Sequence, residues 1–102
     1  MHFEWDEAKN AANLRKHGLS FEEARLIFDG PVLTVQDRRQ DYGEDRFITL
    51  GAIAGLIVVV AVHTDRHGIT RLISARLANR KERIRYHVHI TAETESLGGP
   101  DR

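Results

Sequence analysis

The side chains that could carry out chemistry are concentrated between residues 63 and 87. Six of the seven basic residues there are arginine, whose guanidinium binds phosphate through paired hydrogen bonds and stabilises charge developing on it. Arg76, Arg80 and Arg83 are spaced by four and three, so they would share one side of a helix that starts near Arg76. We therefore expect a phosphate-binding cluster, with a solvated helix face around Glu82 as the alternative. The basic residues of this stretch are Arg66, Arg71, Arg76, Arg80, Lys81, Arg83 and Arg85, set against Asp65 and Glu82.

Histidine offers either metal ligands or proton-transfer groups. His63 and His67 are four residues apart, but they fall on a predicted strand and turn, which do not present them as a helical pair would. Without cysteine and without nearby carboxylates, we expect no zinc site and no cofactor. Beside arginines, a histidine is better interpreted as a proton-transfer group. His17 and His63 are the candidates, although for each of them a structural role is the interpretation that we favour.

The single tryptophan has two interpretations. Trp5 lies one helical turn before Lys9, and such a pair could stack a nucleic-acid base beside a cation. A tryptophan in this place more often anchors an N-terminal helix to the core, and we favour that role. The sequence has no glycine-rich phosphate loop, nucleophile elbow or paired-carboxylate site.

Composition restricts the class of protein. With 102 residues, of which 41% are hydrophobic and 29% charged, the chain has the size and composition of one soluble globular domain. The absence of cysteine excludes disulfide scaffolds, thiolate zinc sites and cysteine nucleophiles. The longest apolar stretch, residues 51–62, is too short to span a bilayer, and the acidic first residues contain no apolar signal region. We expect a cytoplasmic protein.

The net charge of zero conceals an asymmetry along the chain. Residues 1–51 carry seven basic and ten acidic side chains, a charge of −3, whereas residues 52–102 carry eight and five, a charge of +3. The neutral total argues against nonspecific coating of a polyanion. The local stripe of arginine is nevertheless compatible with a short nucleic-acid footprint.

The first third of the sequence predicts a short strand and two helices. Two aromatic residues flanking one polar residue indicate a strand over residues 3–5. A helix should begin after Asp6 as its N-cap and run to about residue 17, where Gly18 ends it. Ser20 and Glu23 form the pattern of a capping box for a second helix, which residues 30–31 (Gly-Pro) terminate.

The remainder predicts four strands and a last helix. Phe47 should lie on one face of its strand and Ile48 and Leu50 on the other. The strand over residues 56–64 is apolar on both faces, so it should be central and covered on each side. The predicted strands are residues 32–35, 46–50, 56–64 and 69–75, and the helix runs from residue 79 to about residue 87.

These elements predict an α+β fold in one domain over residues 1–88. A small antiparallel sheet would carry two N-terminal helices and one C-terminal helix. In such a meander Arg66, at a hairpin turn, and Arg71, on the next strand, would be neighbours. Residues 89–102 show no periodicity, and we expect a flexible tail there.

Several motifs along the chain resemble the BrnT family of toxins. The resemblance covers about residues 3–87, in order and at family-like spacing. Its most specific part is Lys-His-Gly followed by Phe-x-Glu-Ala, with a later Ile-Ser-Ala-Arg. The matching segments are residues 3–9, 13–24, 28–29, 43–47, 51, 63–66 and 71–76, followed by Glu82 and Tyr86.

The resemblance implies a RelE-like ribonuclease toxin of a type II toxin–antitoxin system. The implied partner is a BrnA-like antitoxin with a ribbon-helix-helix region, in a heterotetramer that binds operator DNA and represses its own operon. The implied reaction needs no metal or cofactor: the ribose 2′-hydroxyl attacks the adjacent phosphate, which leaves a cyclic phosphate and a free 5′-hydroxyl. Translation would be inhibited by the resulting cleavage of RNA. The alternative is a non-catalytic interaction module of a DNA-binding repressor complex.

The implied chemistry requires charge stabilisation at the phosphorane, a base and an acid. Under the resemblance we assign charge stabilisation to Arg66, Arg76 and Arg80, and proton transfer to His17. This hypothesis requires that guanidinium groups from the second half of the chain converge on one hollow. The residues expected to bind RNA are Lys9, Lys16, Arg46, Arg71, Arg83 and Tyr86.

Overall fold

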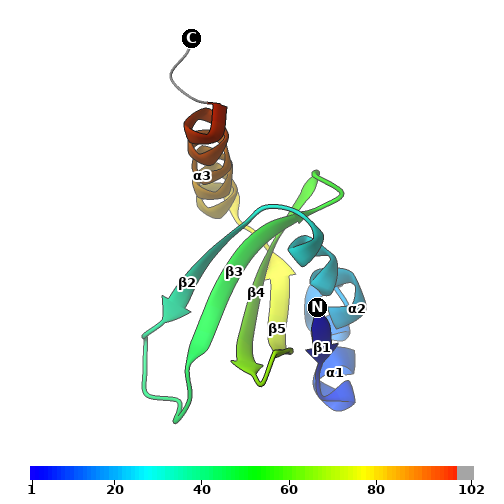
Figure 1. Ribbon diagram of the computed structural model, residues 1–102. Helices are drawn as coiled ribbons and strands as arrows, with labels where there is room; N and C mark the ends of the chain where they lie inside the picture. The colour runs from blue at the N-terminus through cyan, green and yellow to red at the C-terminus, as the bar shows by residue number, and fades with distance from the viewer. Residues whose placement is uncertain (99–102) are drawn as a thin grey trace.

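The protein folds as a five-stranded sheet with helices on both faces, which confirms the predicted α+β class (Figure 1). The computed structural model describes residues 1–98. The strand order is β1-β5-β4-β3-β2. Along the chain the elements are β1 (His2–Glu4), α1 (Glu7–His17), α2 (Phe21–Ala24), the 3₁₀ helix η1 (Arg25–Asp29), β2 (Val32–Asp37), β3 (Arg46–Ile53), β4 (Ile57–Arg66), β5 (Ile69–Leu77) and α3 (Arg80–Gly98).

The sheet is mixed, so the prediction of a purely antiparallel sheet is wrong at one edge. Strands β2 to β5 form an antiparallel meander, but β1 pairs in parallel with β5, with His2 opposite Ile69 and Glu4 opposite Arg71. Alternation of apolar and polar residues predicts a strand but carries no information about its direction or partner. The first residues therefore could be recognised as a strand without their neighbour being known.

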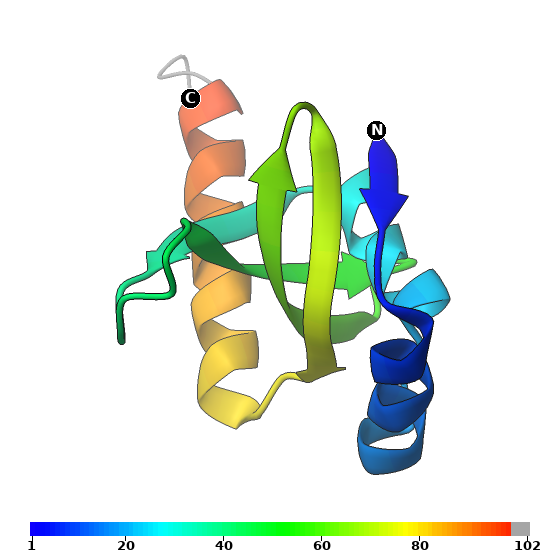
Figure 2. The ribbon, with the colours of Figure 1, turned by 90° about the horizontal axis from the view of Figure 1, so that it is seen from below.

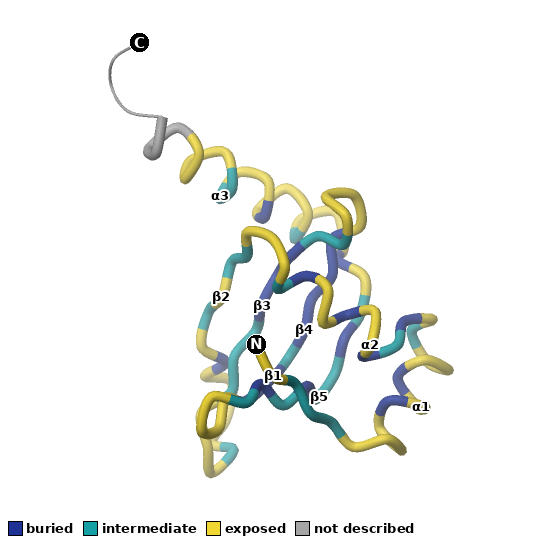
Figure 3. The backbone as a smooth tube through the Cα atoms, turned by 45° about the vertical axis from the view of Figure 1, so that its right-hand side comes forward, coloured by how far each residue is buried: buried dark blue, intermediate teal, exposed yellow. Residues whose placement is uncertain are grey.

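The central strand β4 is covered on both faces, as predicted. Val59 and Ala61 pack with the buried Phe21 and Ile27 from the N-terminal helices, whereas Val60 belongs to the cluster formed with α3. Figure 2 shows α3 on one side of the sheet and α1 on the other, and in Figure 3 the buried residues lie mainly along the inner strands. Alternate residues of one strand thus build two cores.

Local capping defines the N-terminal helices as predicted. The Asp6 side chain accepts a hydrogen bond from the Lys9 amide at 3.1 Å, and Gly18 ends α1 in the left-handed conformation with φ of 70°. Ser20 and Glu23 form both bonds of the capping box. The second helix is shorter than predicted because the chain tightens into η1, where Ile27 packs closely against Gly51 of β3; a Cβ on Gly51 would lie 2.7 Å from that of Ile27.

The last helix is longer than predicted. Asn79 and Glu82 cap its start, because the amide of each is bonded to the side chain of the other at 2.9 Å. Buried Tyr86 anchors it by donating its hydroxyl to the carbonyl of Pro31 at 2.8 Å. The helix then continues to Gly98, so the boundary predicted at residue 88 lies inside α3. Residues 91–94 are exposed, which weakens the apolar period. Of the tail predicted at residues 89–102, residues 89–98 belong to α3, and residues 99–102 lie outside the described residues.

No helix within residues 1–98 is both long enough and apolar enough to cross a membrane.

A buried side-chain amide attaches α1 to the edge of β5. Strand β1 pairs only with residues 69–71 of β5. Further along β5, the Asn13 side chain donates to the carbonyl of Ala75 at 2.8 Å and accepts from the amide of Ala75 at 3.1 Å. The same Asn13 amide donates to the carbonyl of Leu19 at 2.8 Å. Asn13 therefore takes the place of a neighbouring strand, and it fixes the end of α1 beside β5.

Substitution of this amide should destabilise the fold. Asn13→Ala leaves buried backbone groups of Ala75 and Leu19 without partners, at about 1–3 kcal/mol for each unpaired group. We expect the free energy of unfolding, measured by urea denaturation, to fall by about 3 kcal/mol. Arg15→Ala, on the exposed part of the same helix, is the control and should change the free energy by less than about 0.5 kcal/mol. Equal stability of the two variants would contradict the role of Asn13.

Candidate functional site

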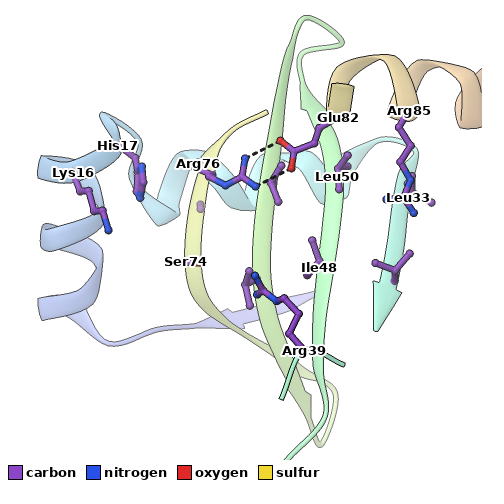
Figure 4. Close-up of a pocket in the computed structure, with 14 residues that line it drawn as sticks. Lys16, His17, Leu33, Arg39, Ile48, Leu50, Ser74, Arg76, Glu82 and Arg85 are labelled. Carbon is purple, nitrogen blue, oxygen red and sulfur yellow. Dashed lines mark hydrogen bonds and ion pairs between the residues drawn. The ribbon is translucent and has the colours of Figure 1, made fainter. Parts of the chain in front are cut away.

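A cleft of about 530 Å³ lies on the face of the sheet that carries α3 (Figure 4). It is bordered by the end of α1, strands β2 to β5, the β2–β3 loop and the start of α3. Residues from distant parts of the sequence are thus brought into one hollow. The lining residues are Lys16, His17, Leu33, Val35, Arg39, Ile48, Leu50, Val60, Val62, Ser74, Ala75, Arg76, Glu82 and Arg85.

The floor of the cleft is apolar because α3 covers only one end of this face. Leu50 and Val60 are buried beneath the helix, in the cluster that contains Tyr86. Ile48 and Val62, further along the same strands, are only half-buried. An apolar floor that stays accessible suits a planar, partly apolar group such as a nucleobase.

The rim of the cleft is cationic. Lys16 and His17 come from the last turn of α1, which Asn13 holds beside β5. The register of β5 shifts at Ile73, so that Ser74 pairs with Val62 while Leu72 pairs with His63. This irregularity turns Ser74 and Arg76 toward the cleft and leaves Leu72 in the core under α1 and α2.

A forked ion pair fixes Arg76. Its two terminal nitrogens each donate to one oxygen of Glu82 at 2.8 Å, and its side chain remains 44% exposed. These bonds raise the pKa of Arg76 and lower the pKa of Glu82 from 4.5 to about 2. The charge of Arg39 opposes the rise in the pKa of Arg76, as expected for two like charges facing one cleft. Both guanidiniums are therefore charged near neutral pH.

Two lining cations were not identified from the sequence. Arg39 lies in the β2–β3 loop and Arg85 on α3. A loop has no periodicity that could assign a direction to Arg39. Arg85 belonged to the recognised arginine stripe, but only the docking angle of α3 determines which of its arginines reaches the cleft.

The structure does not gather the predicted catalytic arginines. Along β4, Arg66 lies six residues beyond Val60, the partner of Arg76, which is roughly 20 Å of strand. Arg66 binds Glu44 there at 2.6 Å, and Arg80 is exposed outside the lining of the cleft. Of the four predicted catalytic residues, Arg76 and His17 reach the cleft. The distance along the strand explains the separation of Arg66.

Arg66 and Arg71 lie diagonally across adjacent strands, as predicted, because Arg66 pairs with Ile69. Their guanidiniums nevertheless bind different carboxylates. Arg71 pairs with Thr64 in the sheet and turns toward β1, where it binds Glu4 at 3.0 Å. This ion pair lies at the junction of β1 and β5 and is outside the cleft lining.

The other predicted RNA-binding residues are dispersed. Lys16 lines the cleft, whereas Lys9 is exposed elsewhere on α1. The guanidinium of Arg46 lies 4.1 Å from the ring centre of Tyr42. Arg83 donates to the carbonyl of Ala78 at 3.1 Å, at the start of α3.

Two aromatic residues are structural. Tyr86, on α3, is only 4% exposed and packs between the helix and the sheet. It therefore cannot stack on a base in this conformation. Trp5 packs against Phe21 in an edge-on arrangement with ring centres 6.1 Å apart, and it is partly buried against the core. It therefore anchors the N-terminal segment, as we favoured from the sequence.

His63 is part of the core on the opposite face. Its ring lies between Phe28 and Phe47, with centres 5.4 and 5.7 Å away. One ring nitrogen is bonded to Thr49 at 2.8 Å and the other to Asp65 at 3.0 Å. Both nitrogens are thus occupied, in agreement with the structural interpretation of His63. No group of three His, Asp or Glu residues within the described chain is arranged to hold a metal ion.

Stability at acidic pH should depend on Glu82. Because its pKa in the folded protein is about 2, below the ordinary 4.5, ionised Glu82 stabilises the fold fully above pH 4.5 and loses this effect as the pH falls toward 2. Glu82→Gln removes the charge. We expect the difference in unfolding free energy between the wild type and this variant to be largest near neutral pH and to shrink between pH 4.5 and 2, measured by urea denaturation. A difference between the wild type and Glu82→Gln that does not change with pH would refute the prediction.

Comparison with known proteins places the chain in a family. The family model described as the ribonuclease toxin BrnT of type II toxin–antitoxin systems matches residues 5–82. Among solved structures, the chain is similar to the ribonuclease toxin BrnT of Brucella abortus, with 26% identity and a TM-score of 0.59, over 78% of this chain and 99% of that one. A comparison with curated proteins gives no match. Since the family model spans more than half of the sequence, the chain belongs to the BrnT family of ribonuclease toxins of type II toxin–antitoxin systems.

Proposed function

We propose that this chain is a metal-independent endoribonuclease whose cleft holds the phosphodiester that is cut. The observation that carries the proposal is the meeting of Arg76, Lys16 and His17 over an accessible apolar floor. In the reaction, the ribose 2′-oxygen bonds to phosphorus and the bond from phosphorus to the 5′-oxygen breaks. The products are a cyclic phosphate and a free 5′-hydroxyl, and the proton lost by the 2′-hydroxyl is balanced by the one the 5′-oxygen gains.

Each cleft residue has a chemical part in this reaction. Arg76 neutralises the charge that accumulates on the phosphorane, since Glu82 already holds its guanidinium over the cleft. His17 exchanges a proton with the 2′-hydroxyl or the leaving 5′-oxygen. Lys16, its neighbour on the last turn of α1, binds a phosphate oxygen. The half-buried floor accepts the base beside the cut.

The arginines outside the cleft have a different part. Arg80 and Arg83 are exposed at the start of α3, the helix that also supplies Arg85 to the lining. They would bind phosphates of the RNA chain beyond the cut and add affinity without taking part in the chemistry. Arg66, paired with Glu44 far along β4, has no part in catalysis.

Membership of a type II toxin–antitoxin family implies an antitoxin partner. We propose a BrnA-like antitoxin with a ribbon-helix-helix region, in a heterotetramer that represses its own operon through operator DNA. The cationic rim favours an acidic antitoxin segment, which would cover the cleft and exclude RNA. Free toxin would then cut RNA in the cytoplasm and inhibit translation.

Cleavage of a defined single-stranded RNA by the purified protein in the presence of EDTA tests the enzymatic proposal. We expect metal-independent cutting, and a fall in rate of about 100-fold or more for Arg76→Ala and for His17→Ala, because each removes stabilisation of the transition state. Arg66→Ala is the matched control and should cut at nearly the wild-type rate.

Folding must be monitored in the same experiment because Arg76→Ala leaves Glu82 without its partner. Arg76→Lys keeps the charge, and thermal unfolding of each variant shows whether lost activity reflects lost structure. Intact RNA with the wild type, together with tight antitoxin binding, would support the non-catalytic module instead. An Arg66→Ala variant as inactive as Arg76→Ala would overturn the assignment of the cleft.

A further inference from the structure

Arg39, in the β2–β3 loop, is bonded to a buried carboxylate. Asp37, the last residue of β2, has a completely buried side chain. Its carboxylate accepts from the Arg39 amide at 3.2 Å, from Nε at 2.8 Å and from Nη2 at 2.7 Å, and also from the Tyr42 hydroxyl at 3.0 Å. Four donors thus satisfy one buried carboxylate, and three of them belong to the same residue.

The consequence of these bonds is a guanidinium with one edge fixed and the other free. Arginine has five N–H donors, and the bonds from Nε and Nη2 use two of them. The Arg39 side chain is 71% exposed and lines the cleft, so the remaining donors are accessible from it. An arginine that is already held in place loses less conformational entropy when it binds a ligand.

The neighbouring Arg38 shows that this order is specific to one position. Arg38 is bonded to Gln36, an exposed residue, at 3.1 Å and is not among the residues that line the cleft. Two adjacent arginines of the same loop therefore have different partners: Arg38 is bonded to the exposed Gln36, whereas Arg39 is bonded to the buried Asp37 and lines the cleft.

The second arginine of the cleft, Arg76, is held in the same manner. A carboxylate binds each guanidinium through two hydrogen bonds, Asp37 for Arg39 and Glu82 for Arg76. Figure 4 shows Arg39 and Arg76 reaching over the strands of the floor from different elements, a loop and β5. A ligand that accepts hydrogen bonds from both would need anionic oxygens pointing in two directions, as a phosphodiester backbone has.

We propose that Arg39 is a phosphate-binding residue of this cleft, which contacts the RNA backbone from the side opposite Arg76, and that Asp37 is its positioning residue. The inference rests on the proposed RNA-cleaving function and extends it from α1 and β5 to the β2–β3 loop. The loop thereby becomes a second wall of the substrate site.

Binding of a single-stranded RNA in which every ribose is 2′-O-methylated tests this proposal separately from cleavage. Such an RNA lacks the attacking hydroxyl, so it reports affinity alone. We expect Arg39→Ala to raise Kd about tenfold, and Arg38→Ala, the matched control, to change it less than about twofold. The slope of log K against log salt should become shallower by about 0.7 for Arg39→Ala, because one phosphate contact is lost from a single strand, and should not change for Arg38→Ala.

Two further variants separate positioning from charge. Arg39→Lys keeps the charge without the fork and should bind with intermediate affinity. Asp37→Asn should raise Kd while retaining the wild-type salt slope, because Arg39 stays charged but is less well held. If thermal unfolding shows that Asp37→Asn does not fold, Arg39→Lys and the salt slopes still decide the question.

The outcomes distinguish the two proposals. Wild-type binding of the methylated RNA without cleavage of unmodified RNA would overturn the proposed enzymatic function, while weaker binding by Arg39→Ala would still support the phosphate contact. Equal affinities and salt slopes for Arg39→Ala and Arg38→Ala would overturn the inference. A wild type that binds no RNA would overturn both.

Discussion

The bidentate bond between Arg76 and Glu82 is the interaction on which the cleft depends. Glu82 belongs to the capping box at the start of α3, and Arg76 stands at the end of β5, so one carboxylate sets both the beginning of the helix and the direction of the guanidinium. Tyr86, one turn later, donates its hydroxyl to the carbonyl of Pro31, just before β2, and so fixes α3 to the sheet. The helix is thereby held over one end of the floor and leaves the other end accessible.

A second junction brings the N-terminal helix to the same place. Asn13 pairs with the backbone of Ala75, next to Arg76, and Lys16 and His17 follow within one turn of α1. Edges of sheets must have their backbone groups satisfied, and a side-chain amide does so here while it positions a cationic helix end. Structural bonds and candidate functional groups are thus adjacent in sequence on both sides of the cleft.

Features governed by near neighbours in the chain were predictable from the sequence. The caps at Asp6, Gly18 and Ser20 act over a few residues, and the two-sided burial of β4 follows from its continuous apolar run. The parallel pairing of β1 depends on distant chain segments, and the register shift in β5 that turns Arg76 toward the cleft leaves no mark on the pattern.

The same distinction explains which site residues could be anticipated. His17 and Lys16 were found on a motif, but Arg39 is positioned by buried Asp37, which lies beyond the strand predicted over residues 32–35. The arginines of the cleft are paired with carboxylates, Asp37 and Glu82, so a cationic cleft is compatible with a net charge of zero for the chain. Because the whole molecule attracts polyanions only weakly, affinity for RNA must come from the few oriented guanidiniums of the cleft. Loss of one of them therefore removes a larger share of binding than it would in a strongly basic protein.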